Sequence, residues 1–263
     1  MTTSPRAAIH AICTRMTTPE LAPRAIATAE KLPLVAFSGW LASGKDHIAR
    51  ALYRDLSIPV SHLSFATAIR GELDELMVLL TGSGTQQEAA TQISAIMEMP
   101  KPEAWTLCQL LLDGQPLDSA RDRLAGLDAY QRTPAIRRAL QYLGLEVRRA
   151  QDQDYWVHRA QETAITELAC GRAFTFTDVR LPNEVSGLQV IGVKVIRLEI
   201  SRATQLARLA SRDGLGPDPA ALKHGTETAL DEYTGFDLVC NNEAPLEVVV
   251  EQILDHLAVS AAA

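Results

Sequence analysis

Residues 32–56, "LPLVAFSGWLASGKDHIARALYRDL", contain three local signals in succession. The apolar run 32–39 stops at a glycine, which is typical of a buried parallel strand. A short turn with two glycines follows, and residues 45–56 then place apolar side chains at helical spacing. The stretch therefore predicts a strand, a tight loop and an amphipathic helix.

The turn between these elements fits the pattern G-x-x-x-x-G-K, which is typical of a loop that holds the phosphates of ATP. Its glycines let several backbone N–H groups face one anion, and the helix N-terminus adds partial positive charge. Lys45 supplies a full charge to the β- and γ-phosphates. We expect ATP to be bound by Gly39, Trp40, Ala42, Ser43, Gly44, Lys45, Asp46 and His47.

Asp46 stands where such loops usually carry Ser or Thr, whose hydroxyl binds Mg²⁺. A carboxylate is also a good ligand, because magnesium prefers oxygen donors. We expect Asp46 to be a metal ligand; the alternative is that it only complements the positive helix N-terminus.

The composition is that of a globular protein: 263 residues, 47% hydrophobic and 22% charged. A net charge of −7 disfavours a stable nucleic-acid partner, because DNA-binding proteins present a basic face. No apolar run approaches the ~20 residues of a membrane span, and the N-terminus lacks a signal-peptide core. The four Cys lack metal or redox spacing, so we expect reduced thiols and a cytoplasmic protein. The glycine-rich loop predicts small-molecule nucleotides as its partners. Whether it is a monomer or a homodimer stays open.

Strand and helix patterns alternate in the flanking parts of the chain. Further strands are predicted in residues 59–65, 173–179, 192–200 and 236–242, and further helices in 182–192, 202–212 and 245–257. This alternation predicts an α/β domain, residues 33–263, with a parallel sheet between helices.

Three other segments complete the predicted organisation. Residues 1–32 read as an N-terminal helical extension, with an N-cap Thr in "TTPEL" at 17–21. Residues 66–170 read as a mostly helical insertion. Region 201–230 includes a stretch rich in Gly and Pro that reads as a mobile loop.

Four stretches carry a family resemblance: "SGKD" (43–46), "LQYLGLEVRRAQDQDYWV" (140–157), "FTDVRLPNE" (176–184) and "HGTETALDEYTGFDLVCNN" (224–242). In this order they resemble motifs of phage-type deoxynucleoside monophosphate kinases, a branch of the P-loop nucleoside-monophosphate kinases. The chain also resembles phosphomevalonate kinase, which shares the "SGKD" loop. One departure is Leu145, which stands where the kinase family has Thr.

The resemblance implies a P-loop NTPase fold, a three-layer sandwich with a five-stranded parallel sheet in the order 2-3-1-4-5. It also implies that the helical insertion 66–170 binds the substrate and that region 201–230 is a lid. It implies ATP and Mg²⁺ as cofactors, a deoxynucleoside monophosphate as acceptor and, for a phage protein, the host cytoplasm as location. The predicted catalytic residues are Lys45, Asp178, Arg208 and Arg212, with Asp46 and Asp178 as metal ligands.

Acceptor binding is predicted for Arg70, Arg137, Gln141, Arg149, Trp156, Arg180 and Glu227. Arg180 follows a predicted strand, where ligands of open α/β sheets bind. Arg137 and Gln141 are four residues apart and share a helix face. Trp156 is expected to stack on a base or to wall its pocket. The resemblance also brings His224 and Asp231 toward the site.

Three alternatives stay open. In the first, the acceptor is another small phosphorylated molecule, such as phosphomevalonate or a modified nucleotide. In the second, the protein is a nucleotide-binding switch of low turnover. In the third, the protein phosphorylates a base within DNA, which the acidic net charge disfavours.

Overall fold

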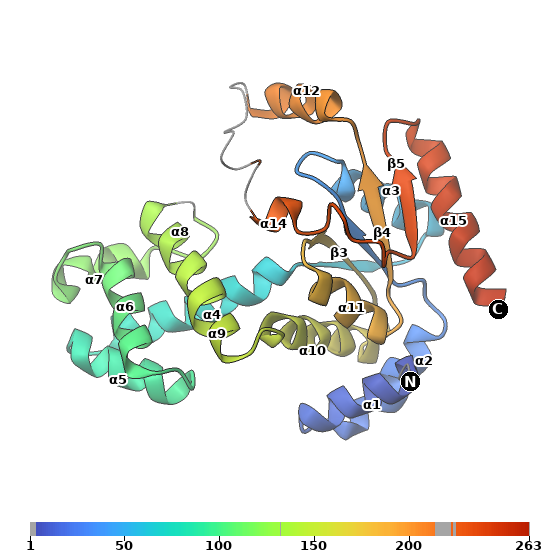
Figure 1. The fold of residues 1–263 in the computed structure, drawn as a ribbon. Helices are drawn as coiled ribbons and strands as arrows, with labels where there is room; N and C mark the ends of the chain where they lie inside the picture. The colour runs from blue at the N-terminus through green and yellow to red at the C-terminus, as the bar shows by residue number, and fades with distance from the viewer. Residues whose placement is uncertain (1–3, 132, 214–221, 223–224, 263) are drawn as a thin grey trace. The chain divides into compact units, whose positions relative to one another are not determined.

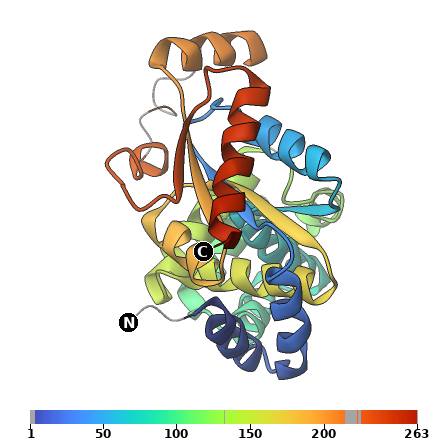
Figure 2. The same cartoon turned by 90° about the vertical axis from the view of Figure 1, so that its right-hand side faces the viewer.

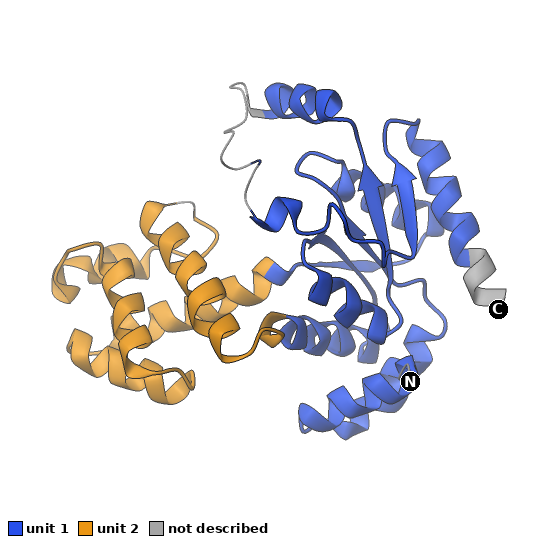
Figure 3. Ribbon diagram, viewed as in Figure 1, with its two compact units in different colours: residues 1–65, 157–263 blue, residues 66–156 orange. Residues whose placement is uncertain are grey.

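The computed structural model describes residues 4–131, 133–213, 222 and 225–262. The chain forms two compact units (Figure 3). Unit 1 consists of residues 1–65 and 157–263, and unit 2 consists of residues 66–156.

Unit 1 is built on a five-stranded sheet (Figure 1). Its strands are β1 (Val35–Ser38), β2 (Val60–Leu63), β3 (Ala173–Val179), β4 (Lys194–Glu199) and β5 (Leu238–Asn241). The order is β2-β3-β1-β4-β5 and every neighbouring pair is parallel, so the predicted fold is confirmed. Ser38 at the end of β1 pairs with Val179 on one side and Arg197 on the other, so the carboxyl ends of three strands meet at one edge.

Helices form a layer on each face of this sheet (Figures 1 and 2). On one face, α3 (Lys45–Leu56) and α15 (Leu246–Ala262) pack against β1, β4 and β5 in a single hydrophobic cluster. Side chains such as Phe37, Leu52 and Ile253 are fully buried there. The other face is covered by α10 (Tyr155–Ala169) and α11 (Pro182–Val190).

The N-terminal extension packs on unit 1. It forms α1 (Pro5–Arg15), a 3₁₀ turn η1 (Pro19–Leu21) and α2 (Ala22–Ala29), and it buries Ile9, Cys13 and Ala25. The predicted helix start at 17–21 is wrong. Thr18 makes no capping hydrogen bond, and the α-helix begins only after the 3₁₀ turn.

Unit 2 is helical throughout. Its elements are α4 (Phe65–Gly82), α5 (Gln86–Ile96), α6 (Lys101–Leu112), α7 (Leu117–Ala125), α8 (Pro134–Gln141), the π-helix η2 (Tyr142–Arg148) and α9 (Arg149–Gln151). In its interior the guanidinium of Arg148 pairs with Glu72 and donates to Met97 O at 2.7 Å. Unit 2 ends at residue 156, earlier than the expected 170, because most of α10 packs with the sheet.

Further helices of unit 1 lie between β4 and β5 in the sequence. Helix α12 (Arg202–Asp213) follows β4, and the short helix α14 (Gly225–Thr228) precedes β5. Of the predicted lid, residues 214–221 and 223–224, including His224, lie outside the described residues. No helix in the described ranges is both long and apolar enough to cross a membrane.

Candidate active site

The loop after β1 has a backbone that only glycine adopts freely at two positions. Gly39 has a φ of 147°, and a Cβ there would lie 2.5 Å from Leu198 O. Gly44 has a φ of 91°, and a Cβ there would lie 2.6 Å from Asn242 Nδ2. These positive φ values wrap residues 39–45 tightly around the start of α3. The predicted strand, loop and helix are therefore present, and α3 spans the predicted residues 45–56.

Lys45 folds back onto the loop. Its Nζ donates to Gly39 O at 2.7 Å and Trp40 O at 2.9 Å. Burial, followed by the charge of Arg180, lowers the pKa of Lys45 to about 8, although Glu227 and Asp46 act in the opposite direction. A phosphate placed beside this ammonium would favour its charged form.

The loop opens on a cavity of about 450 Å³, which we call the loop cavity. It is lined by Leu41, Ala42, Gly44, Lys45, Asp46, His47, Arg50, Thr177, Asp178, Arg180, Arg208 and Arg212. Five of these side chains are Lys or Arg and two are Asp, an excess of three positive charges when Lys45 is protonated. Such a cavity at a helix N-terminus is suited to a polyanion such as a nucleoside triphosphate.

The two aspartates of the loop cavity already have hydrogen-bond donors. Thr177 Oγ1 donates to Asp46 Oδ1 at 2.6 Å, and Ser64 Oγ donates to Asp178 Oδ2 at 2.8 Å. The described residues contain no group of three or more potential metal ligands. One or two carboxylates suffice where the nucleotide phosphates complete the shell of Mg²⁺, so Asp46 and Asp178 fit this role.

Arg208 lies against the loop from helix α12. One terminal nitrogen is 3.4 Å from Ala42 O and 3.3 Å from Ser43 O, and the other donates to Asn242 O at 2.9 Å. Arg212, one turn further along α12, also lines the loop cavity. The two predicted catalytic arginines, Arg208 and Arg212, thus both line the loop cavity.

Helix α12 is anchored at its start. Ser201 Oγ and the backbone N–H of Ser201 donate to Glu243 Oε1 at 2.7 and 3.0 Å, and Thr204 Oγ1 donates to the same oxygen. These bonds, that from Thr204 first, hold the pKa of Glu243 at about 2. The carboxylate therefore fixes the helix that carries the two arginines.

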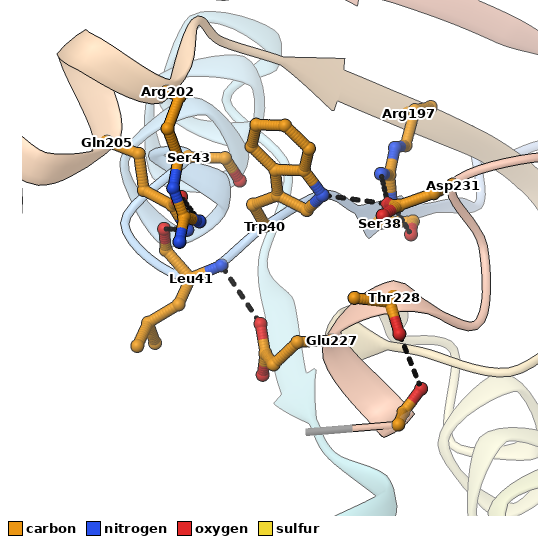
Figure 4. A network of polar contacts seen from close by, with 12 residues as sticks. Ser38, Trp40, Leu41, Ser43, Arg197, Arg202, Gln205, Glu227, Thr228 and Asp231 are labelled. Atoms are coloured by element: carbon orange, nitrogen blue, oxygen red, sulfur yellow. Dashed lines mark hydrogen bonds and ion pairs between the residues drawn. The ribbon is translucent and has the colours of Figure 1, made fainter. Parts of the chain in front are cut away.

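A network of polar contacts joins the loop to the segment before β5 (Figure 4). Glu227, whose side chain is 12% exposed, pairs with Arg180 and accepts from the Leu41 N–H at 3.1 Å. Asp231 accepts from Trp40 Nε1 at 2.8 Å and from the buried Arg197 at 3.1 Å. Glu227, predicted to bind the acceptor, and Trp40, predicted to bind ATP, are thus members of this network. Arg180, the partner of Glu227, also lines the loop cavity.

Unit 2 holds a second cavity, of about 310 Å³, which we call the α8 pocket. It is lined by Arg70, Ala129, Tyr130, Gln131, Ile136, Arg137, Leu140 and Gln141. Three predicted acceptor-binding residues, Arg70, Arg137 and Gln141, therefore lie together. The guanidinium of Arg70 lies 5.0 Å from the centroid of the Tyr130 ring.

Trp156 does not lie in this pocket, and its predicted stacking role is wrong for this structure. It is 1% exposed, and its indole Nε1 donates to Gly144 O at 2.9 Å, so neither the ring nor its polar atom is open to a ligand. Arg149, the other predicted acceptor-binding residue of unit 2 outside the α8 pocket, is half-buried in α9.

Several residues of these sites were not predicted, and three of them matter for the chemistry. Arg50 lies four residues after Asp46, so helical spacing would have placed it near the loop. Arg197 is the strand partner of Ser38, a register that the sequence does not reveal. Tyr130 lies in a connection between helices that carries no motif.

No family model and no curated protein matches this sequence. Among solved structures, a gluconokinase from Sinorhizobium meliloti 1021 is similar over 88% of this chain and 94% of its own. The identity is 14% and the TM-score is 0.42. A likeness at this level carries no argument about substrate or mechanism.

Proposed function

We propose that this protein is an ATP- and Mg²⁺-dependent kinase that phosphorylates a deoxynucleoside monophosphate. The observation that carries the proposal is the loop cavity, where a glycine-rich loop, a helix N-terminus and an excess of basic side chains converge. Phosphoryl transfer needs this kind of positioning and charge neutralisation rather than covalent chemistry by the protein.

In the proposed reaction, an oxygen of the acceptor phosphate forms a bond to the γ-phosphorus of ATP. The bond between that phosphorus and the β,γ-bridging oxygen breaks, and ADP leaves. The acceptor oxygen is already ionised at neutral pH, so the step needs no general base. This agrees with a cavity whose carboxylates have hydrogen-bond donors.

The side chains of the loop cavity have separate tasks in this reaction. Lys45 holds the β- and γ-phosphates, and Arg208 and Arg212 stabilise the charge on the transferring group. Asp46 and Asp178 would hold Mg²⁺, which neutralises phosphate charge when it is bound. Arg180, whose guanidinium is paired with Glu227, adds positive charge to the same cavity.

The α8 pocket supports a phosphorylated acceptor, because Arg70 and Arg137 line it and no Asp or Glu is among its described lining residues. An Arg can donate two parallel hydrogen bonds to a phosphate, and Gln141 can pair with a base edge. A switch protein of low turnover needs no such second anion-binding site.

The direct test is to incubate the protein with ATP, Mg²⁺ and each deoxynucleoside monophosphate separately, and to resolve the nucleotides by chromatography. We expect ADP and one deoxynucleoside diphosphate in equal amounts. ADP without a new diphosphate would replace the proposal with a slow ATPase or switch. No product with any of the four would refute the proposed acceptor and direct the search to phosphomevalonate and modified nucleotides.

A further inference from the structure

The α8 pocket brings two cations without counter-charges to one cavity. Within the described residues, Arg70 and Arg137 make no ion pair and no side-chain hydrogen bond; the contact of Arg70 is with the Tyr130 ring. The neighbouring Arg138, by contrast, pairs with Asp113 at 2.5 Å. Two unneutralised guanidinium groups beside one cavity predict an anionic ligand.

Tyr130 adds an aromatic surface to the same pocket. It is 58% exposed. The other large apolar side chains that are exposed in the described ranges are all aliphatic. With Arg70 against its ring, more than half of the Tyr130 surface is still open. Exposed aromatic rings and arginine planes are the usual stacking surfaces for nucleic-acid bases.

The connection that carries Tyr130 is held in a defined conformation. Asp128 Oδ1 accepts from the backbone N–H groups of Tyr130 at 2.8 Å and Gln131 at 3.0 Å. Asp74 Oδ1, on α4, accepts from the N–H of Ala129 at 2.7 Å. The ring is therefore presented by a fixed turn, which lowers the entropy lost when a ligand binds.

We infer that Tyr130, with Arg70 behind it, is the stacking surface for the nucleobase of the acceptor, while Arg137 binds the phosphate of the same molecule. This inference rests on the proposed function and names the residue that recognises the aromatic base of its acceptor. An aliphatic acceptor such as phosphomevalonate has no ring to stack and would leave Tyr130 unused.

The test measures binding rather than turnover, on the full chain without ATP. Titration calorimetry compares the deoxynucleoside monophosphate that binds best with deoxyribose 5-phosphate, which lacks the base. We expect Tyr130→Leu to weaken the nucleotide at least tenfold, the range of a lost base–aromatic stack, and to leave deoxyribose 5-phosphate unchanged. Tyr130→Phe keeps the ring and should bind like the wild type.

Two arginine variants separate phosphate binding from general charge. Arg137→Gln should weaken both ligands, and Arg138→Gln, whose side chain pairs with Asp113, should weaken neither. Protection of Tyr130 from nitration by tetranitromethane in the wild type, mapped by peptide mass, tests the same contact without a substitution. The nucleotide should protect Tyr130 and deoxyribose 5-phosphate should not.

The outcomes separate this inference from the proposed function. Equal nucleotide affinity of the wild type and Tyr130→Leu, or nitration that the nucleotide does not slow, would overturn the inference even if diphosphate is formed. Binding that depends on Tyr130 without any diphosphate product would uphold the inference and refute the kinase. No measurable binding of any of the four nucleotides would overturn the inference as well.

Discussion

Replacement of Gly44 by Ala tests whether the loop conformation depends on close packing as well as on backbone freedom. Gly44 has a φ of 91°, and a Cβ there would lie 2.6 Å from Asn242 Nδ2. That amide is buried and donates to Ser43 O. An added methyl group must therefore displace a hydrogen-bonded side chain, because this distance is far below van der Waals contact.

The expected loss of stability has two parts. A left-handed conformation costs a residue with a Cβ about 1–2 kcal/mol. Displacing Asn242 removes a buried hydrogen bond and adds about 1–3 kcal/mol. Gly44→Ala should thus lower the free energy of unfolding of unit 1 by about 2–5 kcal/mol.

Gly171→Ala is the matched control. Gly171 also belongs to unit 1 and has a φ of 78°, but no atom lies within 4 Å of the point where its Cβ would be, so this variant carries only the backbone part of about 1–2 kcal/mol. Urea unfolding followed by far-UV circular dichroism gives both values, with unchanged m-values required for the comparison. Equal losses for the two variants would refute the packing argument. A further check is the double variant Gly44→Ala with Asn242→Ala, whose loss should be smaller than the sum of the single losses.

Three further predictions concern Lys45, Asp46 and Trp156. ATP affinity at fixed Mg²⁺ should be constant below pH 8 and fall by up to about tenfold per pH unit above it. Above pH 8 Lys45 is neutral in the free protein, so ATP binding must be accompanied by uptake of a proton. A calorimetric affinity that stays constant up to about pH 9.5 would contradict this. Asp46→Ala should raise the Mg²⁺ concentration needed for half-maximal turnover at an unchanged unfolding midpoint, whereas Asp55→Ala, on the same helix but outside the loop cavity, should not; equal Mg²⁺ curves would remove the metal role of Asp46. Trp156→Phe should lower the free energy of unfolding by about 1–3 kcal/mol through the lost bond to Gly144 O, with KM for the acceptor unchanged; a large rise in KM would instead return Trp156 to the substrate site.

Local patterns predicted the elements of unit 1 well. Helix α3 was predicted from its apolar spacing and the preceding Gly44, and β3 from a run of apolar and β-branched residues. The strand order came from the family resemblance, because no pattern within a strand states which neighbour it pairs with. The register that places Arg197 beside Ser38 is of the same kind and was missed.

Side-chain direction was predicted less well in unit 2. An aromatic residue in an amphipathic helix has the same pattern whether it lines a pocket or the core, and packing decided that Trp156 is buried. Tyr130 was missed because a turn held by Asp128 carries no periodic signal. The end of the regular α-helix at Gln141 was also missed, since a π-helix does not follow the 3.6-residue period used to find helices.

The strand order has a consequence for synthesis of the chain on the ribosome. The strands β1 and β2 emerge first, yet neither pairs with the other: Val35 pairs with Thr175 and Val60 with Ala173, both beyond the whole of unit 2. Unit 2 is continuous in sequence and made of local helical contacts, so we expect it to fold while the first two strands still lack partners. The nascent chain therefore holds two unpaired strands until β3 is made, the apolar β1 and the more polar β2. This interval is when a chaperone that binds extended segments has most to protect.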